Sequence, residues 1–367
     1  MPLQIIPFTE QHLLAVEAFN RRMTGGKAAS DFLLPTNPVS TPPDKDSVIN
    51  WTRFVVVDGE EVRGGVLKMD QPGWLNGQEV RAINFQSPLS EGIVDPKHSI
   101  VAMQIVKFEQ KQGEVVFMVG MGSQERPLPR LLSAAGWSVR PVPFLFRVHR
   151  AARFLKEVGV LHTNSFPSVV ARVARLTGVG SIGISILQRQ RVRCHGVVRR
   201  EKSWGSWADE IWESYRESCC FAVKRDRNTL TGLYPTDDPR LQILVIYREQ
   251  KPVGWAVCVN TRFRNHHYFG NLQVGSILDC VAIPDAMALT AVLADHELSS
   301  AGADLVLANQ SHAEWVKAFR SSGFLTGPSN YLLAMSKRLT EAVRSVQGGD
   351  QRVHITRGDG DGRIHLL

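Results

Sequence analysis

The sequence repeats itself, and this internal repeat limits the possible folds more than any other feature. When Gly136 is aligned with Gly323, residues 130–137 (RLLSAAGW) fall on residues 317–324 (KAFRSSGF) without a gap. In both copies a helical pattern ends at a glycine, where a left-handed helix cap needs no Cβ atom, and an aromatic residue follows. The same pattern in both halves indicates that one structural unit occurs twice.

The repeat extends toward the N-terminal end of each copy. Residues 55–67 (VVVDGEEVRGGVL) resemble residues 245–257 (VIYREQKPVGWAV). Each segment predicts a strand, a tight polar turn and a second strand with a glycine soon after the turn. Two copies of so long a pattern favour a duplicated α/β domain. Two unrelated domains that share turn chemistry are the weaker alternative.

The second copy shows the order of elements most clearly. Apolar alternation that ends at Pro284 predicts a half-buried strand, and an apolar stripe that begins at Leu289 predicts a helix that Gly302 stops. Residues 304–308 form a short apolar run suited to a buried strand, and residues 311–322 predict a second helix. This copy therefore contains a strand–helix–strand–helix–strand unit.

A chain of 367 residues accommodates two domains of about 150 residues and a connector. The repeat predicts a first domain over residues 1–150, a basic helical connector over 151–200 and a second domain over 201–340. The Gly/Asp/Arg-rich segment 341–367 predicts an exposed tail. The predicted fold class is α/β (α+β), with a mixed, mostly antiparallel central sheet flanked by helices in each domain.

The net charge of +8 is moderate, and the basic residues gather in the connector rather than along one helix face. This distribution disfavours a DNA-binding protein, which needs a basic patch with stacking aromatics. It suits anionic ligands such as CoA phosphates or an acidic membrane surface. Residues 165–180 predict a basic amphipathic helix. Such a helix either bridges the two domains or makes a peripheral contact with a membrane.

The five cysteines indicate a reducing compartment. Cys219 and Cys220 are adjacent, the others are isolated, and no CxxC motif occurs, so the sequence predicts neither a zinc site nor a disulfide framework. The first residues lack the basic start and the long apolar core of a signal peptide. We therefore expect a cytoplasmic protein without a bound metal.

Short motifs recur at matching places in both copies. GEEVRGGV and QKPVGWAV lie in the hairpins, AAGW and SSGF end the last helices, and strand–proline–helix junctions occur at Pro96 and Pro284. Together with the element order, these motifs resemble the GNAT acyltransferase superfamily, here present twice. The tandem arrangement also resembles GNAT-like acyltransferases that accompany bacterial polysaccharide and cell-envelope synthesis, including Fem-type aminoacyl transferases.

The resemblance implies an acyl-CoA, such as acetyl-CoA, held where two central strands diverge. Its pyrophosphate would bind the N-terminus of the central helix, where unpaired N–H groups and the helix dipole favour phosphate. The acyl group would pass directly to an amine or hydroxyl of a small-molecule or glycan acceptor. A carboxylate or water would act as base, and N–H groups would stabilise the oxyanion. The resemblance implies no nucleophilic triad.

Both copies depart from the family pattern at the phosphate loop, which has a Gln or Arg followed by two glycines. The first copy has residues 96–103 (PKHSIVAM), without glycine, where Lys97 and His98 are the candidates for phosphate contact. The second has residues 284–290 (PDAMALT), where Asp285 would repel phosphate. These departures motivate an alternative, a catalytically inactive protein that binds a ligand or partner in a biosynthetic assembly. Fem-type transfer from aminoacyl-tRNA is a further alternative.

The other candidate site residues follow the central strands. Asp279, near the end of the second copy's central strand, is the first candidate for the general base, and Glu91 in the first copy is the alternative. His312 and Asn309 follow the next strand and are candidates to relay a proton or orient substrate. Ala282 and Asn309 are also candidates for binding the cofactor. Each residue also has a structural interpretation, such as a hydrogen-bonded Asp at a strand end or a His at a helix N-terminus.

Overall fold

The computed structural model describes most of the chain. The described residues are 2–38, 48–113, 115–157, 187–188 and 195–360. Their contacts divide the chain into two compact units. Unit 1 contains Met1–Gly73, Gln78–Arg140 and Leu332–Ser345, and unit 2 contains Trp74–Gly77, Pro141–Tyr331 and Val346–Leu367.

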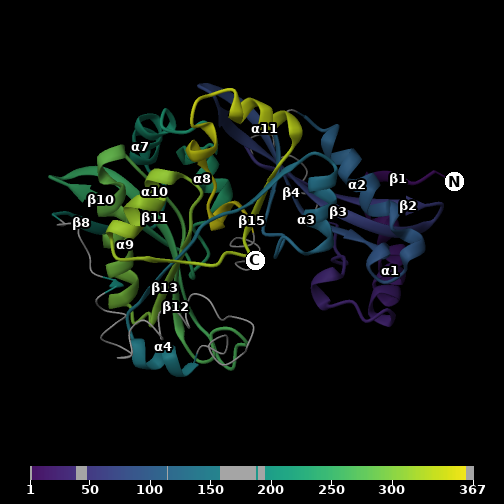
Figure 1. Ribbon diagram of the computed structural model, residues 1–367, viewed down its shortest axis with the longest axis horizontal. Helices are drawn as coiled ribbons and strands as arrows, with labels where there is room; N and C mark the ends of the chain where they lie inside the picture. The colour runs from purple at the N-terminus through teal and green to yellow at the C-terminus, as the bar shows by residue number, and fades with distance from the viewer. Residues whose placement is uncertain (1, 39–47, 114, 158–186, 189–194, 361–367) are drawn as a thin grey trace. The chain divides into compact units, whose positions relative to one another are not determined.

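Unit 1 is built on a mixed sheet whose strands run in the order β1-β2-β3-β4-β5-β15-β6 (Figure 1). The pairs β1–β2, β2–β3 and β5–β15 are antiparallel, and β4–β5 is parallel. The strands are β1 (Gln4–Pro7), β2 (Asn50–Asp58), β3 (Glu61–Leu75), β4 (Gln78–Ser90), β5 (Val115–Val119), β15 (Leu332–Met335) and β6 (Ser138–Pro141). The helices are α1 (Leu13–Gly25), α2 (Ile100–Gln110) and α3 (Pro127–Ala134).

Helices cover both faces of this sheet. α2 and α3 lie on one face, where Val101 and Leu132 belong to the same apolar core as Phe85. α1 lies on the other face, where Phe19 packs in a core with Val55. Side chains of successive strand residues point to opposite faces, so an apolar strand supplies both cores.

The two central strands of unit 1 pair over only part of their length. The parallel pairs run from Ala82–Val115 to Phe85–Met118, whereas β4 continues to Ser90. Ser87, within this unpaired end, has a positive φ of 47°, which interrupts the regular pleat. We call the unpaired end of β4 (residues 86–90), with the chain that leads from it into α2 (residues 91–100), the first splay. That chain contains two short helices, η3 (Glu91–Ile93) and η4 (Pro96–His98).

Unit 2 is built on a sheet in the order β14-β7-β13-β12-β11-β10-β8 (Figure 1). Its β12–β13 pair is parallel, and its other pairs are antiparallel. The strands are β14 (Leu325–Gly327), β7 (Phe144–Val148), β13 (Leu305–Asn309), β12 (Gln273–Ala282), β11 (Lys251–Arg262), β10 (Gln242–Arg248) and β8 (Val197–Glu201). The helices include α7 (Ser206–Arg216), α8 (Arg227–Leu233), α9 (Met287–Ser300) and α10 (Ala313–Ser321). Two mixed, mostly antiparallel sheets flanked by helices confirm the predicted fold class.

The central strands of unit 2 diverge in the same way. Parallel pairs join Val274 to Leu305 and, at the far end, Ile277 to Ala308, whereas β12 continues to Ala282. We call the unpaired end of β12 (residues 278–282), together with the end of β13, the second splay.

The repeat is visible in how each central helix packs on its sheet. It aligns Gly64 in β3 with Gly254 in β11. A Cβ atom at Gly64 would lie 2.9 Å from Val101 Cγ1 in α2, and one at Gly254 would lie 2.2 Å from Thr290 Oγ1 in α9. The glycine that follows each hairpin turn therefore lets the central helix approach the sheet closely.

Each unit contains a strand from the other half of the sequence. β7 follows the Gly-aromatic pair of the first copy but lies between β13 and β14 in unit 2. β15 comes from the second copy but lies between β5 and β6 in unit 1. The predicted boundaries 1–150 and 201–340 assign both strands to their own copies. An apolar strand pattern predicts burial in a sheet without specifying which of two similar sheets it joins, and this explains the difference.

The chain beyond residue 340 is built into the fold. Its elements are α11 (Lys337–Arg344), η7 (Gly349–Arg352), β16 (Val353–His354) and η8 (Arg357–Asp359). β16 pairs in parallel with β9 (Phe221–Val223), and its side chains are fully buried. The predicted exposed tail is therefore wrong for residues 353–360, which are mostly buried and whose polar groups find partners inside unit 2, whereas most of residues 346–352 are exposed or half-buried. We call residues 353–359 the C-terminal strap.

Within the predicted connector, residues 151–200, the described residues are 151–157, 187–188 and 195–200. α4 (Ala151–Glu157) opens it, and β8 closes it by pairing with β10. The basic amphipathic helix expected over residues 165–180 lies outside the described residues, and so does the membrane contact predicted for it. Among the helices that are described, none has both the length and the apolar character needed to cross a membrane.

Candidate functional site

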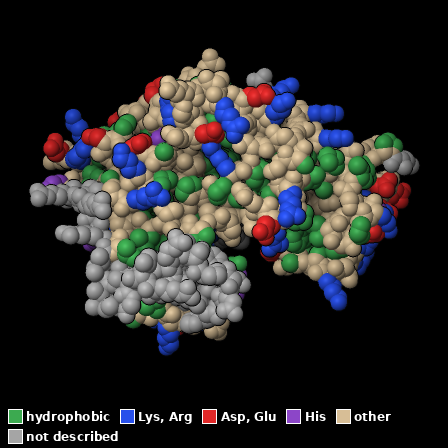
Figure 2. Space-filling view, in the orientation of Figure 1, with side chains coloured by type: hydrophobic (Ala, Val, Ile, Leu, Met, Phe, Trp, Pro, Cys, Tyr) green, Lys and Arg blue, Asp and Glu red, His purple; other side chains and the backbone are tan. Residues whose placement is uncertain are grey.

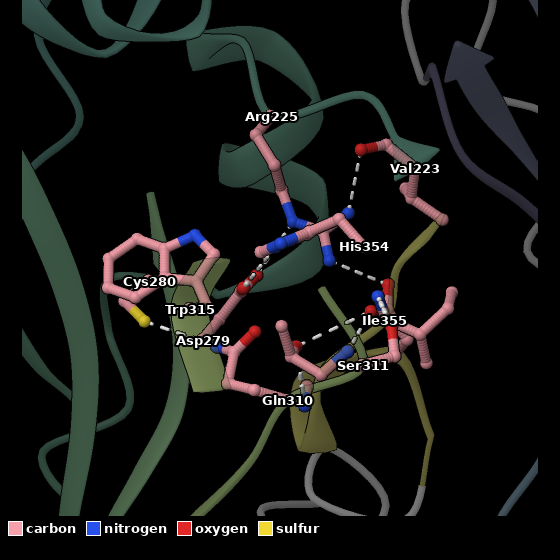
Figure 3. Close-up of polar contacts among 12 residues, drawn as sticks. Val223, Arg225, Asp279, Cys280, Gln310, Ser311, Trp315, His354 and Ile355 are labelled. Carbon is pink, nitrogen blue, oxygen red and sulfur yellow. Dashed lines mark hydrogen bonds and ion pairs between the residues drawn. The ribbon is translucent and has the colours of Figure 1, made fainter. Parts of the chain in front are cut away.

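The C-terminal strap lies along the end of β13 in the second splay. Gln310 forms an antiparallel bridge with Thr356. The Ser311 amide donates to the Ile355 carbonyl at 3.0 Å, and the Ile355 amide donates to Ser311 Oγ at 2.7 Å. Figure 3 shows Gln310, Ser311 and Ile355 in this arrangement. The strap therefore takes the position of a further strand beside the end of β13.

The strap also lies against the unpaired end of β12. A Cβ atom at Gly358 would lie 3.2 Å from the carbonyl oxygen of Leu278 and 1.9 Å from the hydroxyl oxygen of Tyr234, so only glycine fits there. Contacts with both β12 and the end of β13 mean that the strap occupies the second splay. The chain's own backbone thus fills the place where the resemblance implied an acyl-CoA in this copy.

Arg225 ties the strap to β12 through a buried ion-pair network (Figure 3). Its Nε donates to Asp279 Oδ2 at 2.7 Å, and its Nη2 donates to Asp359 Oδ1 at 2.7 Å. Its Nη1 donates to the Val223 carbonyl at 2.9 Å, and the Tyr234 hydroxyl donates to Asp279 Oδ2 at 2.8 Å. Arg225 and Asp279 are fully buried and Asp359 is 1% exposed. Because these charges are shielded from water, their ion-pair and hydrogen-bond partners stabilise them instead.

This environment makes Asp279 a poor general base. Burial raises the pKa of the Asp279 carboxyl, but the Arg225 charge, the neighbouring His354 and the Tyr234 hydrogen bond outweigh burial and hold this pKa well below its usual range. A carboxylate that is ionised and paired with a guanidinium has little affinity for a substrate proton. The catalytic role of Asp279 stays a prediction, and the contacts give this carboxylate a structural role. Asp279 holds Arg225 and, through Arg225, the strap.

Two histidines lie beside this network. His354 Nδ1 is 2.8 Å from the Tyr215 hydroxyl, and its Nε2 is 3.7 Å from Asp279 Oδ1. His312 is 2% exposed, and its Nε2 donates to the Ser218 carbonyl at 3.1 Å. Burial, with a smaller contribution from His354, lowers the pKa of His312 to about 4. His312 is thus neutral near pH 7 and held at the start of α10, and its role as a proton relay stays a prediction.

The residues predicted on the cofactor side of unit 2 are also enclosed. Asn309 is 2% exposed at the end of β13, and its Nδ2 donates to the Pro143 carbonyl at 3.4 Å. Ala282 is fully buried and pairs with Gly254 across β11 and β12. The structure places Asp279, Asn309 and His312 around one splay, as the sequence indicated, but that splay is filled.

In unit 1, Glu91 lies where β4 leaves the sheet. Its carboxylate accepts from Arg22 Nε at 2.7 Å and from Arg63 Nη1 at 3.0 Å. Burial raises the pKa of Glu91, but the two guanidinium groups outweigh burial and lower this pKa below its usual value. Glu91 therefore joins α1 and β3 to the end of β4. Because it is already paired with two cations, it is a weak candidate for the alternative base.

Lys97 and His98 lie where the chain turns into α2. Lys97 Nζ is 2.8 Å from Asp95 Oδ2, and its side chain is 70% exposed. The Lys97 amide donates to Asp95 Oδ1 at 3.2 Å, so this carboxylate caps η4. His98 is half-buried, with its Nε2 4.0 Å from the same carboxylate. Both predicted phosphate contacts thus stand at the entrance to the central helix of unit 1, beside one acidic side chain.

The sequence patterns do not predict several residues near the two splays. Residues 96–103 contain no glycine, and the glycine that allows close approach is Gly92, where a Cβ atom would lie 2.8 Å from Ser99 Cα. Arg225 is not predicted either, because it lies in the charged run of residues 224–227 (KRDR), which gives no sign of burial. Gln86, which directly follows the last β4–β5 pair, carried no recognisable motif.

We also examined the titratable side chains for a metal centre. In the part of the chain that the structure describes, no group of three or more His, Cys, Asp or Glu residues is arranged to hold a metal ion. The four described cysteines, Cys219, Cys220, Cys258 and Cys280, are buried and form no disulfide bond.

Comparison with known proteins gives similarity in structure only. No protein-family model matches the chain, and no curated protein matches it. A probable N-acyltransferase from Enterococcus faecalis shares 9% identity at a TM-score of 0.51, over 94% of this chain and 75% of that one. A GCN5-related N-acetyltransferase from Anabaena variabilis shares 11% identity at a TM-score of 0.50, over 91% and 72%.

A third similar structure is the N-myristoyltransferase of Saccharomyces cerevisiae, solved with bound myristoyl-CoA and inhibitors. It shares 10% identity with this chain at a TM-score of 0.51, over 91% of this chain and 80% of that one. Identities this low carry information about fold alone. In fold, the chain is similar to these acyl-, acetyl- and myristoyltransferases.

Proposed function

We propose that the chain is an acyltransferase that binds an acyl-CoA at the first splay and transfers the acyl group to an amine or hydroxyl. The single observation that carries this assignment is the C-terminal strap, which occupies the second splay. Of the two places that the fold offers to an acyl-CoA, the strap leaves only the one in unit 1. The similar structures are acyl-, acetyl- and myristoyltransferases, which supports this class of reaction.

The first splay offers chemistry that suits such a substrate. The N-terminus of α2 presents backbone N–H groups and the positive end of the helix dipole to a pyrophosphate, and the exposed Lys97 adds a cation. The unpaired end of β4 offers backbone donors and acceptors to the amides of the pantetheine arm. In this proposal the thioester lies toward Phe85, where β4 and β5 meet.

The transfer itself requires one bond exchange. The acceptor nitrogen or oxygen attacks the thioester carbonyl carbon and forms the new bond, the carbon–sulfur bond breaks, and the acceptor proton passes through a base or water to the CoA thiolate. Asp279 and Glu91 are both paired with arginines. We therefore propose that water, rather than either carboxylate, takes the proton from the acceptor.

The acceptor is proposed from resemblance. A small molecule or glycan of cell-envelope or polysaccharide synthesis fits the tandem arrangement, and acetyl is the simplest acyl group. Figure 2 shows Lys and Arg side chains dispersed among acidic ones on the visible face, which supports an acceptor other than DNA. Four described buried cysteines without a disulfide bond suit our proposed cytoplasmic location.

Calorimetry with acetyl-CoA and myristoyl-CoA tests the proposal. We expect one site per chain, and we expect Lys97→Glu to weaken binding because it adds a negative charge at the phosphate end of the first splay. The matched control is Arg248→Glu, because Arg248 at the end of β10 pairs at 2.8 Å with Asp285, which lies just before the central helix of unit 2. This variant should bind like the wild type. Two sites per chain would overturn the assignment to unit 1, and no binding at millimolar concentrations would overturn the proposal.

One observation favours a second candidate, a ligand- or partner-binding protein without catalysis. The described carboxylates at both splays, Asp95, Glu91 and Asp279, are all paired with cations, which leaves no obvious base among them. A protein of this kind would bind acyl-CoA without turnover in the presence of candidate amines. A Fem-type transferase would instead bind aminoacyl-tRNA with an affinity that falls steeply with salt.

A further inference from the structure

Arg53 in β2 carries a charge that no described residue neutralises. The side chain is half-buried, and its Nε is buried without a hydrogen-bond partner. Burial lowers the pKa of the Arg53 guanidinium, and no described carboxylate offsets this effect. The arginines of the neighbouring strands β3 and β4 differ, because each of them forms an ion pair with a carboxylate. A half-buried cation that lacks such a partner favours the binding of an anion.

Gln86 in β4 also lacks partners. It is 4% exposed, and neither its Nε2 nor its Oε1 has a hydrogen-bond partner among the described residues. Buried amides in native proteins are nearly always hydrogen-bonded, so an unpaired one requires an explanation. A ligand that accepts from Nε2 and donates to Oε1 would provide the missing bonds.

The strand register places Arg53 and Gln86 at the same level of the sheet. Arg53 pairs with Leu67 across β2 and β3. A turn of two residues joins the end of β3 to the start of β4, so Leu67 lies opposite Gln86. The same register brings Gly64 beside Leu89, and a Cβ atom at Gly64 would lie 2.3 Å from the Leu89 carbonyl oxygen. Arg53 and Gln86 are therefore two strands apart, or about 10 Å.

Both side chains point to the face of the sheet that α1 covers. Val55, two residues after Arg53, packs in the core beneath α1. Phe85, which directly precedes Gln86, belongs to the core beneath α2 on the other face. Because successive strand residues alternate between faces, Arg53 and Gln86 lie on the same face. A group placed over Leu67, between them, is within reach of both side chains.

The position of Gln86 relates this face to the proposed acyl donor. Gln86 is the first residue beyond Phe85–Met118, the last pair between β4 and β5. In the proposed function the phosphates of acyl-CoA bind at the start of α2, and the thioester lies toward Phe85. Because α2 covers one face, the opposite face, with Arg53 and Gln86, is the side from which an acceptor approaches the thioester.

We propose that Arg53 and Gln86 form an acceptor site that selects an amine or alcohol with an anionic group, either a carboxylate or a phosphate. The inference rests on the proposed function and specifies its acceptor. The planar guanidinium of Arg53 donates two parallel hydrogen bonds to an oxyanion of either kind. Gln86 Nε2 donates to the same anion, and Gln86 Oε1 accepts from the attacking amine or hydroxyl.

Thermal unfolding with inorganic phosphate and with acetate tests the site, at an ionic strength held constant with chloride. We expect at least one of the two anions to raise the melting temperature by about 2–4 °C at ten times its dissociation constant. Arg53→Gln should lose most of this rise. The matched control is Arg130→Gln, which should keep the rise, because Arg130 is an exposed arginine on α3 of the same unit.

The two anions also distinguish the source of the negative charge. A rise with acetate alone indicates a carboxylate on the acceptor, and a rise with phosphate alone indicates a phosphate. Only the part of the rise that depends on Arg53 counts, since phosphate can also bind at the start of α2. No rise with either anion, or the same rise in Arg53→Gln, would overturn the inference. Gln86→Leu should weaken the Arg53-dependent binding several-fold, and wild-type binding by this variant would overturn the assignment of Gln86.

Thermal unfolding without added anion separates binding from a structural role. Arg53→Met keeps the apolar stem of the side chain and removes its charge, so it should melt at or above the wild-type temperature. A marked loss of stability would show that the guanidinium supports the fold and would overturn the inference. Arg53→Lys provides a second variant if the methionine variant does not fold. It keeps the charge without the planar fork, so it should keep only part of the rise.

Calorimetry with free CoA separates the two proposals. Arg53→Gln should leave the affinity for CoA unchanged, and a loss of about tenfold or more would place Arg53 at the cofactor and overturn the inference. If the wild-type protein binds an anion through Arg53 but binds no CoA, the proposed function fails and the anion site remains. If it binds CoA but Arg53→Gln changes the binding of neither anion, only the acceptor site is overturned.

Discussion

At the scale of single residues, the polar groups of unit 2 serve the fold. Arg225 is fully buried and holds two carboxylates, Asp279 from β12 and Asp359 from the strap. Removing one partner of such a network leaves a buried charge without compensation, which costs more than the network contributes as a whole. A residue at a strand end beside the expected cleft resembles a catalytic base by sequence, but its partners decide its role.

Asp279→Asn tests this role. The variant keeps the shape of the side chain and removes its charge, so Arg225 retains only Asp359 as an anionic partner. We expect a loss of about 3 kcal/mol in the free energy of unfolding, measured with denaturant, and an unchanged affinity for acyl-CoA. A variant with wild-type stability and a lost catalytic rate would instead make Asp279 the base.

His312 predicts a pH dependence of stability. Its pKa is lowered to about 4 in the folded protein, against about 6.5 in an unfolded chain. Between these values the unfolded chain binds more protons, so stability is fully present above about pH 6.5 and is lost as pH falls toward 4. The loss amounts to about 3 kcal/mol. His312→Gln keeps a donor for the Ser218 carbonyl without titrating, and its stability should vary less across this range. Equal slopes for the two proteins would contradict the lowered pKa.

At the scale of elements, the sequence patterns predicted the features that depend on residues close together in the sequence. The repeat aligns the hairpin glycines Gly64 and Gly254, and both let the central helix of their unit approach the sheet closely. The strap was not predictable in the same way, because residues 353–359 read as a polar tail by composition. Its burial depends on partners such as Arg225 and Ser311, which are distant in the sequence. Pairing between distant segments leaves no periodic signal in either of them.

Gly358→Ala tests whether the strap packs closely against Tyr234. The added Cβ atom would lie 1.9 Å from the Tyr234 hydroxyl oxygen, so either the strap or Tyr234 must move. We expect a loss of about 1–3 kcal/mol in the free energy of unfolding. Tyr234→Phe removes the obstructing oxygen, so Gly358→Ala should cost less in the Tyr234→Phe background than in the wild type. Equal costs in the two backgrounds would contradict the contact.

At the scale of the whole molecule, the duplication was predictable and the exchange of strands was not. β7 and β15 follow equivalent Gly-aromatic pairs, Gly136–Trp137 and Gly323–Phe324, so the two copies match up to that point. Each strand then joins the sheet of the other unit. A repeat predicts similar sheets, and for that reason it cannot distinguish a strand that closes its own sheet from one that closes its counterpart.

The exchange makes a prediction about fragments. Residues 1–150 contain β7 but lack β15, so β5 and β6 lose the strand between them and Phe117–Val119 lose their antiparallel partners. An unpaired apolar strand at the middle of a sheet exposes backbone groups and core side chains. We expect this fragment to aggregate or remain unfolded by circular dichroism.

A fusion of residues 1–140 to residues 332–345 through a flexible Gly/Ser linker should fold, because it restores unit 1 as the contacts define it. The matched control fuses residues 1–140 through the same linker to residues 141–150, which contain β7 in place of β15. Both fusions carry one apolar strand, so a difference between their melting curves reports which strand the sheet requires. Cooperative unfolding of the β15 fusion alone is the expected result. If the β7 fusion unfolds as cooperatively as the β15 fusion, the sheet accepts its own strand and the exchange is not required for folding.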